Sequence, residues 1–297
     1  MVKKFIVVAI VLLFILVVGA VIVPQFYLSN QRSFQEVTIP GDGYKINGYL
    51  SEGVDPQGKW IILVHGNRKI GQDHELYRVI RNNLPMEYSV LAIDLRGFGG
   101  SSGDGIKQAP NTIDRSEDLL TVENYLVDTY DIQEDQLILI GHSFGAAQVM
   151  KDAQNHNHLL VIPIGLGDWD GLIENPSAVQ SYIRKFQSNT GAVLEPDVLL
   201  DEGKEFTTKA LFNDCPNSPV WMVYASQDDG IQRHKIPYQT LHQLCQSQIN
   251  WSEIALSDHT FGTEFARLPE PLKGIYSRFS LSLLLYRLNG ILSTVGM

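Results

Sequence analysis

Five stretches of the chain are apolar at nearly every position and are spaced as separate strands would be. They cover residues 60–64, 90–93, 137–140, 159–164 and 220–224. Strands that are apolar on both faces are typical of a mostly parallel sheet with both sides covered. Ahead of them, residues 36–39 and 44–50 flank Gly41-Asp42-Gly43, a glycine-containing turn that predicts a hairpin.

Helical patterns lie between these runs. Apolar residues recur at helical spacing in residues 73–83, 113–130, 143–155 and 234–246. In the second of these segments, Leu119, Leu120, Val122 and Leu126 stand among acidic residues, as in a helix with one buried face. This alternation predicts an α/β fold, with a mostly parallel central sheet and helices on both faces, in one domain over residues 36–297.

Residues 167–217 interrupt the alternation. Asn175-Pro176 has the form of a helix start, and four apolar residues follow it at helical spacing, Val179, Tyr182, Ile183 and Phe186. Long loops without structure are uncommon, so we expect a helical insertion that acts as a lid. Its aromatic side chains favour an apolar substrate, although they serve equally well as the core of the insertion itself.

The two ends of the chain are also apolar. Residues 5–23 carry no charge and follow Lys3 and Lys4; as a helix they would be about 28 Å long, close to the thickness of a bilayer. We expect residues 1–23 to be a membrane anchor, or a signal segment cleaved near Ala20, followed by a linker at 24–35. The two lysines would hold the amino terminus in the cytoplasm, which places the domain outside it.

The carboxyl-terminal stretch, residues 279–292, is interrupted by Arg287, Asn289 and Gly290. This pattern is too polar for a second membrane span and predicts a helix that packs on the sheet. The formal net charge of -10 excludes a typical nucleic-acid binder, because phosphate backbones are held mainly by clustered lysine and arginine.

The segment Gly141-His142-Ser143-Phe144-Gly145 lies between a predicted strand and a predicted helix. A sharp turn at this point projects the serine outward, and the flanking glycines avoid collisions with neighbouring backbone. A serine hydroxyl is a weak nucleophile and needs a base that is oriented by an acid. Asp228 follows the predicted strand at 220–224, and His259 follows a further predicted strand at 251–256, in the chain order Ser, Asp, His.

The sequence resembles the α/β-hydrolase fold superfamily over roughly residues 34–290, on five motifs that occur in the family's order. They are residues 64–67 (Val-His-Gly-Asn), 94–101 (Asp-Leu-Arg-Gly-Phe-Gly-Gly-Ser), 141–145, 225–231 (Ala-Ser-Gln-Asp-Asp-Gly-Ile) and 257–259 (Ser-Asp-His). The resemblance implies a catalytic triad of Ser143, Asp228 and His259, with an oxyanion hole from the backbone N–H groups of Asn67 and Phe144. It implies no organic cofactor and no catalytic metal.

Several alternatives stay open. The acid is Asp228 by the family's usual spacing, but Asp229, Asp168 and Asp170 are other candidates. His65 and the turn that contains Asp94 and Arg96 are interpreted as structural.

Outside these motifs, Arg68 and Lys69 are interpreted as a solvated loop edge rather than a site for an acidic substrate. His156 and His158 lack a third ligand in the sequence, so we expect a polar turn and no metal. Cys215 and Cys245 should lie at the edge of the sheet opposite the active site, either as a disulfide or as two buried thiols.

These features predict a serine hydrolase that cleaves a carboxylic ester or thioester of a small-molecule or lipid-like acyl substrate. A peptidase or acyl-amino-acid hydrolase of the same fold is the second interpretation. A membrane-tethered binding protein without catalysis is the third, because a fold alone does not determine function.

Overall fold

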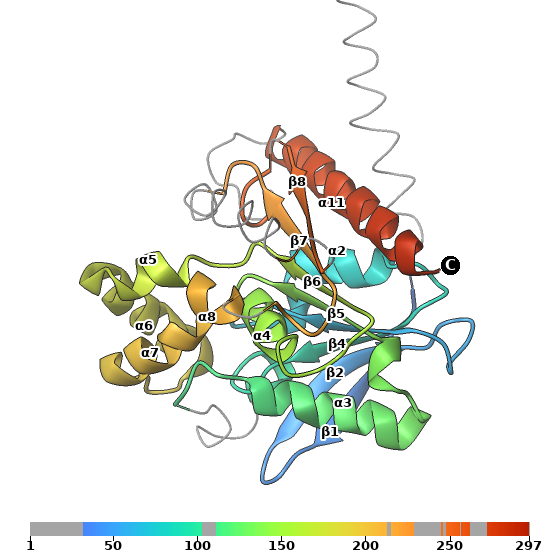
Figure 1. Cartoon of the computed structure of the whole chain (residues 1–297), viewed down its shortest axis with the longest axis horizontal. Coiled ribbons are helices and arrows are strands. Elements are labelled where there is room, and N and C mark those ends of the chain that lie inside the picture. The colour runs from blue at the N-terminus through green and yellow to red at the C-terminus, as the bar shows by residue number, and fades with distance from the viewer. Residues whose placement is uncertain are drawn as a thin grey trace, which may run out of the picture.

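The computed structural model of the chain describes residues 32–102, 111–212, 215–228, 245, 248–255, 257–261 and 272–296. Within them, the strands form a single sheet in the spatial order β1-β2-β4-β3-β5-β6-β7-β8 (Figure 1). They are β1 (Gln35–Pro40), β2 (Lys45–Ser51), β3 (Trp60–Val64), β4 (Ser89–Asp94), β5 (Leu137–His142), β6 (Leu160–Ile164), β7 (Val220–Ala225) and β8 (Ile249–Ile254). β2 pairs antiparallel with β1 and β4, and all later neighbours are parallel.

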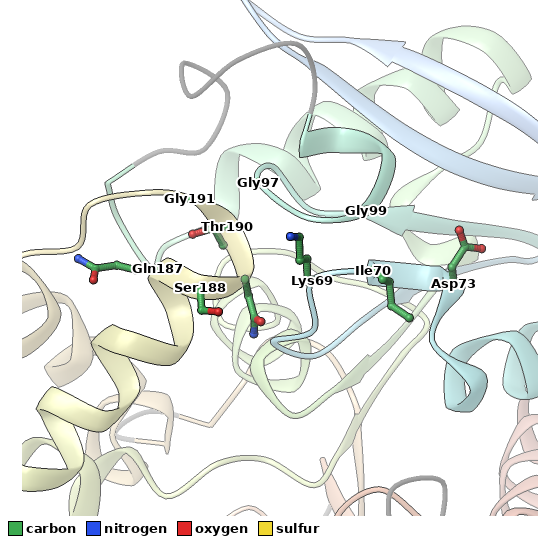
Figure 2. Close-up of a pocket in the computed structure, with 10 residues that line it drawn as sticks. Lys69, Ile70, Asp73, Gly97, Gly99, Gln187, Ser188, Thr190 and Gly191 are labelled. Carbon is green, nitrogen blue, oxygen red and sulfur yellow. The ribbon is translucent and has the colours of Figure 1, made fainter.

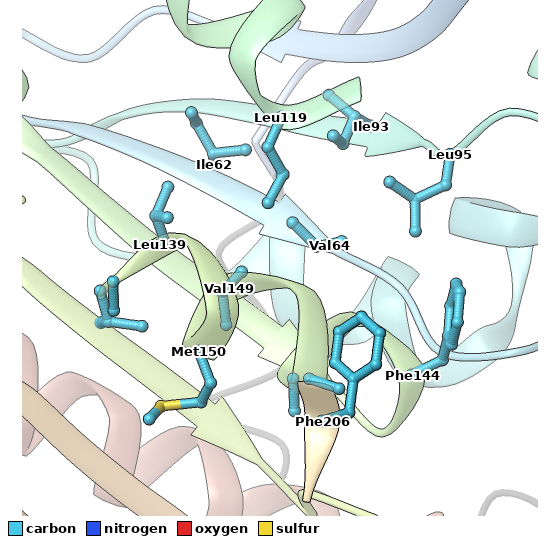
Figure 3. Packing of buried hydrophobic residues seen from close by; sticks show 14 of the residues in the cluster. Ile62, Val64, Ile93, Leu95, Leu119, Leu139, Phe144, Val149, Met150 and Phe206 are labelled. Atoms are coloured by element: carbon cyan, nitrogen blue, oxygen red, sulfur yellow. The ribbon is translucent and has the colours of Figure 1, made fainter. Parts of the chain in front are cut away.

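Helices cover both faces of the sheet (Figure 1). Helices α2 (Glu75–Asn83) and α11 (Leu272–Gly296) pack on one face, and α3 (Ser116–Tyr130) and α4 (Phe144–Asp152) pack on the other. Side chains of a strand alternate between faces, so β3 contributes Ile62 and Val64 to one core and Ile61 and Leu63 to the other. Figure 3 shows the core on the side of α3 and α4. The predicted α/β fold with a covered, mostly parallel sheet is confirmed.

The insertion between β6 and β7 is helical, as predicted. It contains α5 (Trp169–Ile173), α6 (Pro176–Thr190), α7 (Pro196–Gly203), the 3-10 helix η4 (Lys204–Phe206) and α8 (Thr208–Phe212). The Asn175 side chain accepts hydrogen bonds from the backbone N–H groups of Ser177 and Ala178, which caps α6. Phe186 is fully buried and stacks on Tyr182, so this apolar stripe is the core of the insertion.

Helix α11 extends the predicted carboxyl-terminal helix in both directions. Its buried leucines face β8 and α2, which confirms packing on the sheet. Among the described residues, none of the helices combines the length and the apolar character that a membrane span requires. Residues 5–23, and residues 234–246 apart from Cys245, lie outside the described residues, so the membrane segment and that helix stay predictions.

Cys215 and Cys245 form a disulfide, with their Cα atoms 5.7 Å apart. Cys215 precedes β7 and Cys245 precedes β8, so the bond links the regions where two neighbouring parallel strands begin. Of the two alternatives that the sequence left open, the structure has the disulfide. The carboxyl ends of the strands, at the opposite edge of the sheet, carry Ser143, Asp228 and His259.

Candidate active site

Ser143 occupies the turn between β5 and α4 with a positive φ of 55°, a conformation that is rare for a residue other than glycine. Packing enforces this turn: a Cβ atom on Gly145 would lie 2.5 Å from the backbone oxygen of His65. A Cβ atom on Gly141 would lie 2.3 Å from the oxygen of Gly145. The glycines therefore let the turn press against the end of β3, and the serine side chain projects away from the sheet.

His259 and Asp228 reach this serine from the loops after β8 and β7. His259 Nε2 lies 2.8 Å from Ser143 Oγ, and His259 Nδ1 is hydrogen-bonded to Asp228 Oδ2. A carboxylate only accepts hydrogen bonds, so Nδ1 donates and Nε2 is left to accept from the serine hydroxyl. Asp228 is buried, whereas the His259 side chain is 35% exposed. The arrangement can move a proton from Ser143 Oγ to the imidazole while the carboxylate stabilises the resulting charge.

The other candidate acids lie elsewhere. Asp168 accepts a hydrogen bond from the backbone N–H of Gly171 and caps α5. Asp170 accepts from the backbone N–H of Thr208, which joins two parts of the insertion. Asp229 lies outside the described residues. The structure thus brings Asp228 together with His259, and Asp168 and Asp170 support the insertion.

His142, the variable residue before the serine in the motif, connects the two halves of the site. Its Nε2 donates to the backbone oxygen of His259 at 2.8 Å, so Nδ1 carries no proton and accepts from the Tyr77 hydroxyl at 2.9 Å. The same hydroxyl accepts from the backbone N–H of Gly66 at 2.7 Å. Burial, and second the nearby charge of His259, lower the pKa of His142 well below its usual value, which keeps it neutral.

Sequence reasoning missed this connection. Tyr77 lies on α2, far from the motif in the chain, and no local signal pairs it with His142. The chain of hydrogen bonds runs from the loop after β3, through Tyr77 and His142, to the backbone of His259.

Asn67 and Phe144, the oxyanion donors that the resemblance implies, line one pocket together with Ser143. Within the described part of the chain, neither backbone N–H is used in a hydrogen bond, so both can donate to an oxyanion. The loop is fixed by His65, whose Nδ1 donates to Gly66 O at 2.6 Å and whose Nε2 accepts from Leu95 N–H at 3.1 Å. Burial lowers the pKa of His65 to about 4, so the ring stays neutral in this role.

Asn189, at the end of α6, is a second residue that the sequence did not reveal. Its Nδ2 group donates to the backbone oxygen of Asn67 at 3.0 Å and to the Asn67 side-chain oxygen at 2.8 Å. The insertion therefore holds the loop that carries the proposed oxyanion donor.

The Asp94 turn also supports this loop. Asp94 accepts from the backbone N–H groups of Gln72 and Gly100, and Arg96 pairs with Asp118 on α3. Burial raises the pKa of Asp94 to about 6. These contacts fit the structural interpretation of the motif.

The pocket beside Ser143 has a volume of about 220 Å³. Its walls are Asn67, Ser143, Phe144, Gly167, Asp168, Trp169, Leu172, Tyr182 and Lys185. The insertion supplies most of the wall, and its Trp169 ring packs 5.5 Å from that of Tyr182. The pocket is smaller than the roughly 300–1,000 Å³ typical of sites for drug-sized ligands. The geometry therefore suits a small apolar group next to the serine.

A larger, open hollow of about 580 Å³ lies between the end of α6 and the loops after β3 and β4 (Figure 2). It is lined by residues 69–70, 73, 97, 99 and 187–191, and contains none of the three proposed triad residues. Figure 2 shows Lys69 between the end of α6 and Ile70. Lys69 is exposed at this rim, which fits a solvated loop edge.

A model of the alpha/beta hydrolase family matches residues 61–279. A shorter stretch of 120 residues is 28% identical to the multifunctional-autoprocessing repeats-in-toxin of Vibrio cholerae serotype O1. That match covers 37% of this chain and spans only 2% of the toxin.

Solved structures share the fold. An alpha-beta serine hydrolase homologue from Coxiella burnetii is 15% identical with a TM-score of 0.54, over 85% of this chain and 96% of that one. An esterase of Pyrococcus furiosus is 18% identical with a TM-score of 0.56, over 86% and 94% of the two chains. An acylaminoacyl peptidase of Pyrococcus horikoshii is 11% identical with a TM-score of 0.59, over 86% and 41%. At these identities the likeness shows the fold alone.

Proposed function

Because the chain belongs to the alpha/beta hydrolase family, we propose that it is a serine hydrolase that cleaves a carboxylic ester or thioester. The observation that carries this proposal is the hydrogen-bonded series from Ser143 Oγ through His259 to Asp228. A serine placed this way, at a helix amino terminus and next to two N–H groups that make no hydrogen bond to the described residues, has the parts that acyl transfer requires.

The reaction would proceed in two steps. Ser143 Oγ attacks the carbonyl carbon while His259 Nε2 takes its proton, and Asp228 stabilises the imidazolium. The carbonyl oxygen becomes negative and accepts hydrogen bonds from the N–H groups of Asn67 and Phe144, each worth about 3–4 kcal/mol in the transition state. His259 then protonates the leaving alcohol or thiol, which departs and leaves an acyl-enzyme.

Water completes the cycle. It attacks the acyl carbon and gives a proton to His259, which returns the proton to Ser143 Oγ as the carboxylic acid leaves. The apolar walls at Trp169 and Leu172, together with the small pocket volume of about 220 Å³, favour a short acyl group over a long chain.

A substrate panel tests this proposal. The purified chain is assayed with p-nitrophenyl esters of increasing acyl length, an acyl thioester and N-acetyl-amino-acid anilides, beside Ser143→Ala and the exposed-site control Ser188→Ala. We expect short esters to react fastest, Ser143→Ala to be inactive and the control to match the wild type. Faster cleavage of the anilides would favour an acyl-amino-acid hydrolase, and activity retained in Ser143→Ala would contradict a serine mechanism.

We also propose that the domain is exported and stays tethered by residues 1–23, or is released after cleavage of this segment. The Cys215–Cys245 disulfide supports export, because such bonds persist mainly in oxidising compartments. Fractionation of cells that express the full chain tests the tether: the protein should sediment with membranes and resist extraction by high salt. Recovery in the soluble cytoplasmic fraction would contradict it.

A further inference from the structure

A second group of titratable side chains lies at the opposite end of α4 from Ser143. Four residues form it, and we call them the carboxylate–histidine cluster: Glu123, Asp152, His156 and His158. Glu123 lies on α3, Asp152 is the last residue of α4, and the two histidines lie in the loop that leads to β6. Three of the four are buried, and one ligand atom from each lies within 4.8 Å of all the others. This position is about 13 Å from the serine along the helix, so the cluster is separate from the proposed active site.

The distances within the cluster resemble those of a metal site. His156 Nδ1 lies 3.4 Å from a Glu123 oxygen and 3.3 Å from an Asp152 oxygen. His158 Nε2 lies 3.2 Å and 3.4 Å from the other oxygens of the same two carboxylates. In a tetrahedral site with bonds of about 2.0–2.2 Å, ligand atoms are about 3.3–3.6 Å apart. The two histidines contact different oxygens of each carboxylate, and a set with one ligand atom from each residue lies within 4.8 Å.

Hydrogen bonding alone does not account for the cluster. Within the described part of the chain, Asp152 Oδ2 and His156 Nδ1 are buried and make no hydrogen bond. Asp152 Oδ2 lies 3.4 Å from His158 Nε2, and His156 Nδ1 lies 3.3 Å from Asp152 Oδ1. Asp152 is only 4% exposed. A buried polar atom without a partner is costly, and a bound cation would satisfy both atoms at once.

A neighbouring serine directs the ring of His158. Ser218 Oγ donates its one proton to the backbone oxygen of His156 at 2.8 Å, so toward His158 it can only accept. His158 Nδ1 lies 3.3 Å from that oxygen and donates to it. Nε2 lies 3.2 Å from Glu123 Oε1 and donates to it, so His158 would have to release this proton to bind a cation through Nε2. Metal-binding histidines usually donate their second N–H as Nδ1 does here.

The charge of the cluster points to the same ligand. Glu123 and Asp152 place two carboxyl groups close together with little exposure to water, and a divalent cation would offset the repulsion between them. Imidazole ligands favour zinc and related transition metals over magnesium and calcium.

We propose that the carboxylate–histidine cluster binds one divalent transition-metal ion, with zinc as the best fit. All four positions would be filled by protein, which is the arrangement of a structural site. The ion would tie α3, the end of α4 and the loop before β6 together. The expectation of no metal rested on the lack of a third ligand in the sequence, and the fold supplies a third and a fourth.

The experiment uses the full chain purified without a polyhistidine tag, stripped with EDTA, dialysed and then given zinc chloride. We expect one zinc per chain by mass spectrometry of metals. The melting temperature should rise by about 5 °C at a zinc concentration about 100 times the dissociation constant. Calcium and magnesium chloride should leave it unchanged.

Variants locate the ion. Asp152→Asn and His156→Gln should each lose the bound zinc and the zinc-dependent rise in melting temperature, with circular dichroism showing that they are folded. His156 is partly exposed, so its replacement perturbs packing least. Asp128→Asn, an exposed acid on the same helix as Glu123, is the matched control and should bind zinc as the wild type does. The proposal would be overturned if the wild type held no stoichiometric zinc, or if both cluster variants bound zinc as well as the wild type does.

Discussion

His142 Nε2 donates a hydrogen bond of 2.8 Å to the backbone oxygen of His259. The residue next to the proposed nucleophile thus holds the backbone of the proposed base, across 117 positions of sequence. Through Tyr77, the same imidazole also reaches the backbone N–H of Gly66, next to the proposed oxyanion donor. The buried, neutral His142 ring therefore links the backbone of His259 to the loop that carries Asn67.

This relationship makes His142 a positioning residue. His142→Leu removes the donor to His259, and we expect kcat to fall by about 10-fold, equivalent to about 1.4 kcal/mol, with little change in KM. His142→Gln keeps a side-chain N–H and should recover most of the rate. The measurement is steady-state kinetics on the best ester of the panel. A rise in KM at constant kcat, or equal losses in both variants, would contradict the role.

Asn189 lies on the insertion and should affect catalysis through the loop that carries Asn67. Asn189→Ala removes two hydrogen bonds to Asn67, and we expect kcat/KM to fall by about 5- to 30-fold, or about 1–2 kcal/mol. Ser188→Ala, one residue earlier and exposed, is the control and should change little. If the two variants had equal activity, the contact between the insertion and the loop would have no part in catalysis.

His65 should make stability depend on pH. Burial lowers its folded-state pKa to about 4, against about 6.5 in an unfolded chain. Between these values the unfolded state binds more protons, so the stability that His65 contributes is complete above about pH 6.5 and is lost as the pH falls toward about 4. The full loss is about 3 kcal/mol.

Asp94 has the opposite effect on the pH dependence of stability over a similar pH range, because burial raises its pKa to about 6. The prediction therefore concerns the difference between the wild type and His65→Gln in urea unfolding at about pH 7 and about pH 4.5. The wild type should lose about 2–3 kcal/mol more than the variant on acidification. Parallel losses would show that His65 is not the group responsible.

Much of this fold is readable from the sequence because most of its strands are apolar on both faces, which is typical of a covered, mostly parallel sheet. The placement of Ser143 was predictable for a local reason, since glycines at positions 141 and 145 are required by the contacts of the turn itself. Asp228 and His259 could be placed because each follows a strand that ends at the same edge of the sheet.

Contacts between distant elements were not predictable. Asn189 reaches Asn67 only because the insertion folds back over the loop after β3. Likewise, Glu123 meets His158 because α3 and α4 pack on one face, which no spacing along the chain reveals. Residues with ordinary surface chemistry gain these roles from tertiary packing alone.

Covalent labelling tests the central claim, an activated Ser143, most directly. The full chain is treated with a fluorophosphonate probe beside Ser143→Ala, His259→Ala and the control Ser188→Ala, and the modified peptide is mapped by mass spectrometry. The account predicts labelling at Ser143 in the wild type and the control, strong loss in His259→Ala and none in Ser143→Ala. A folded wild type that stays unlabelled, or a label on another residue, would contradict it.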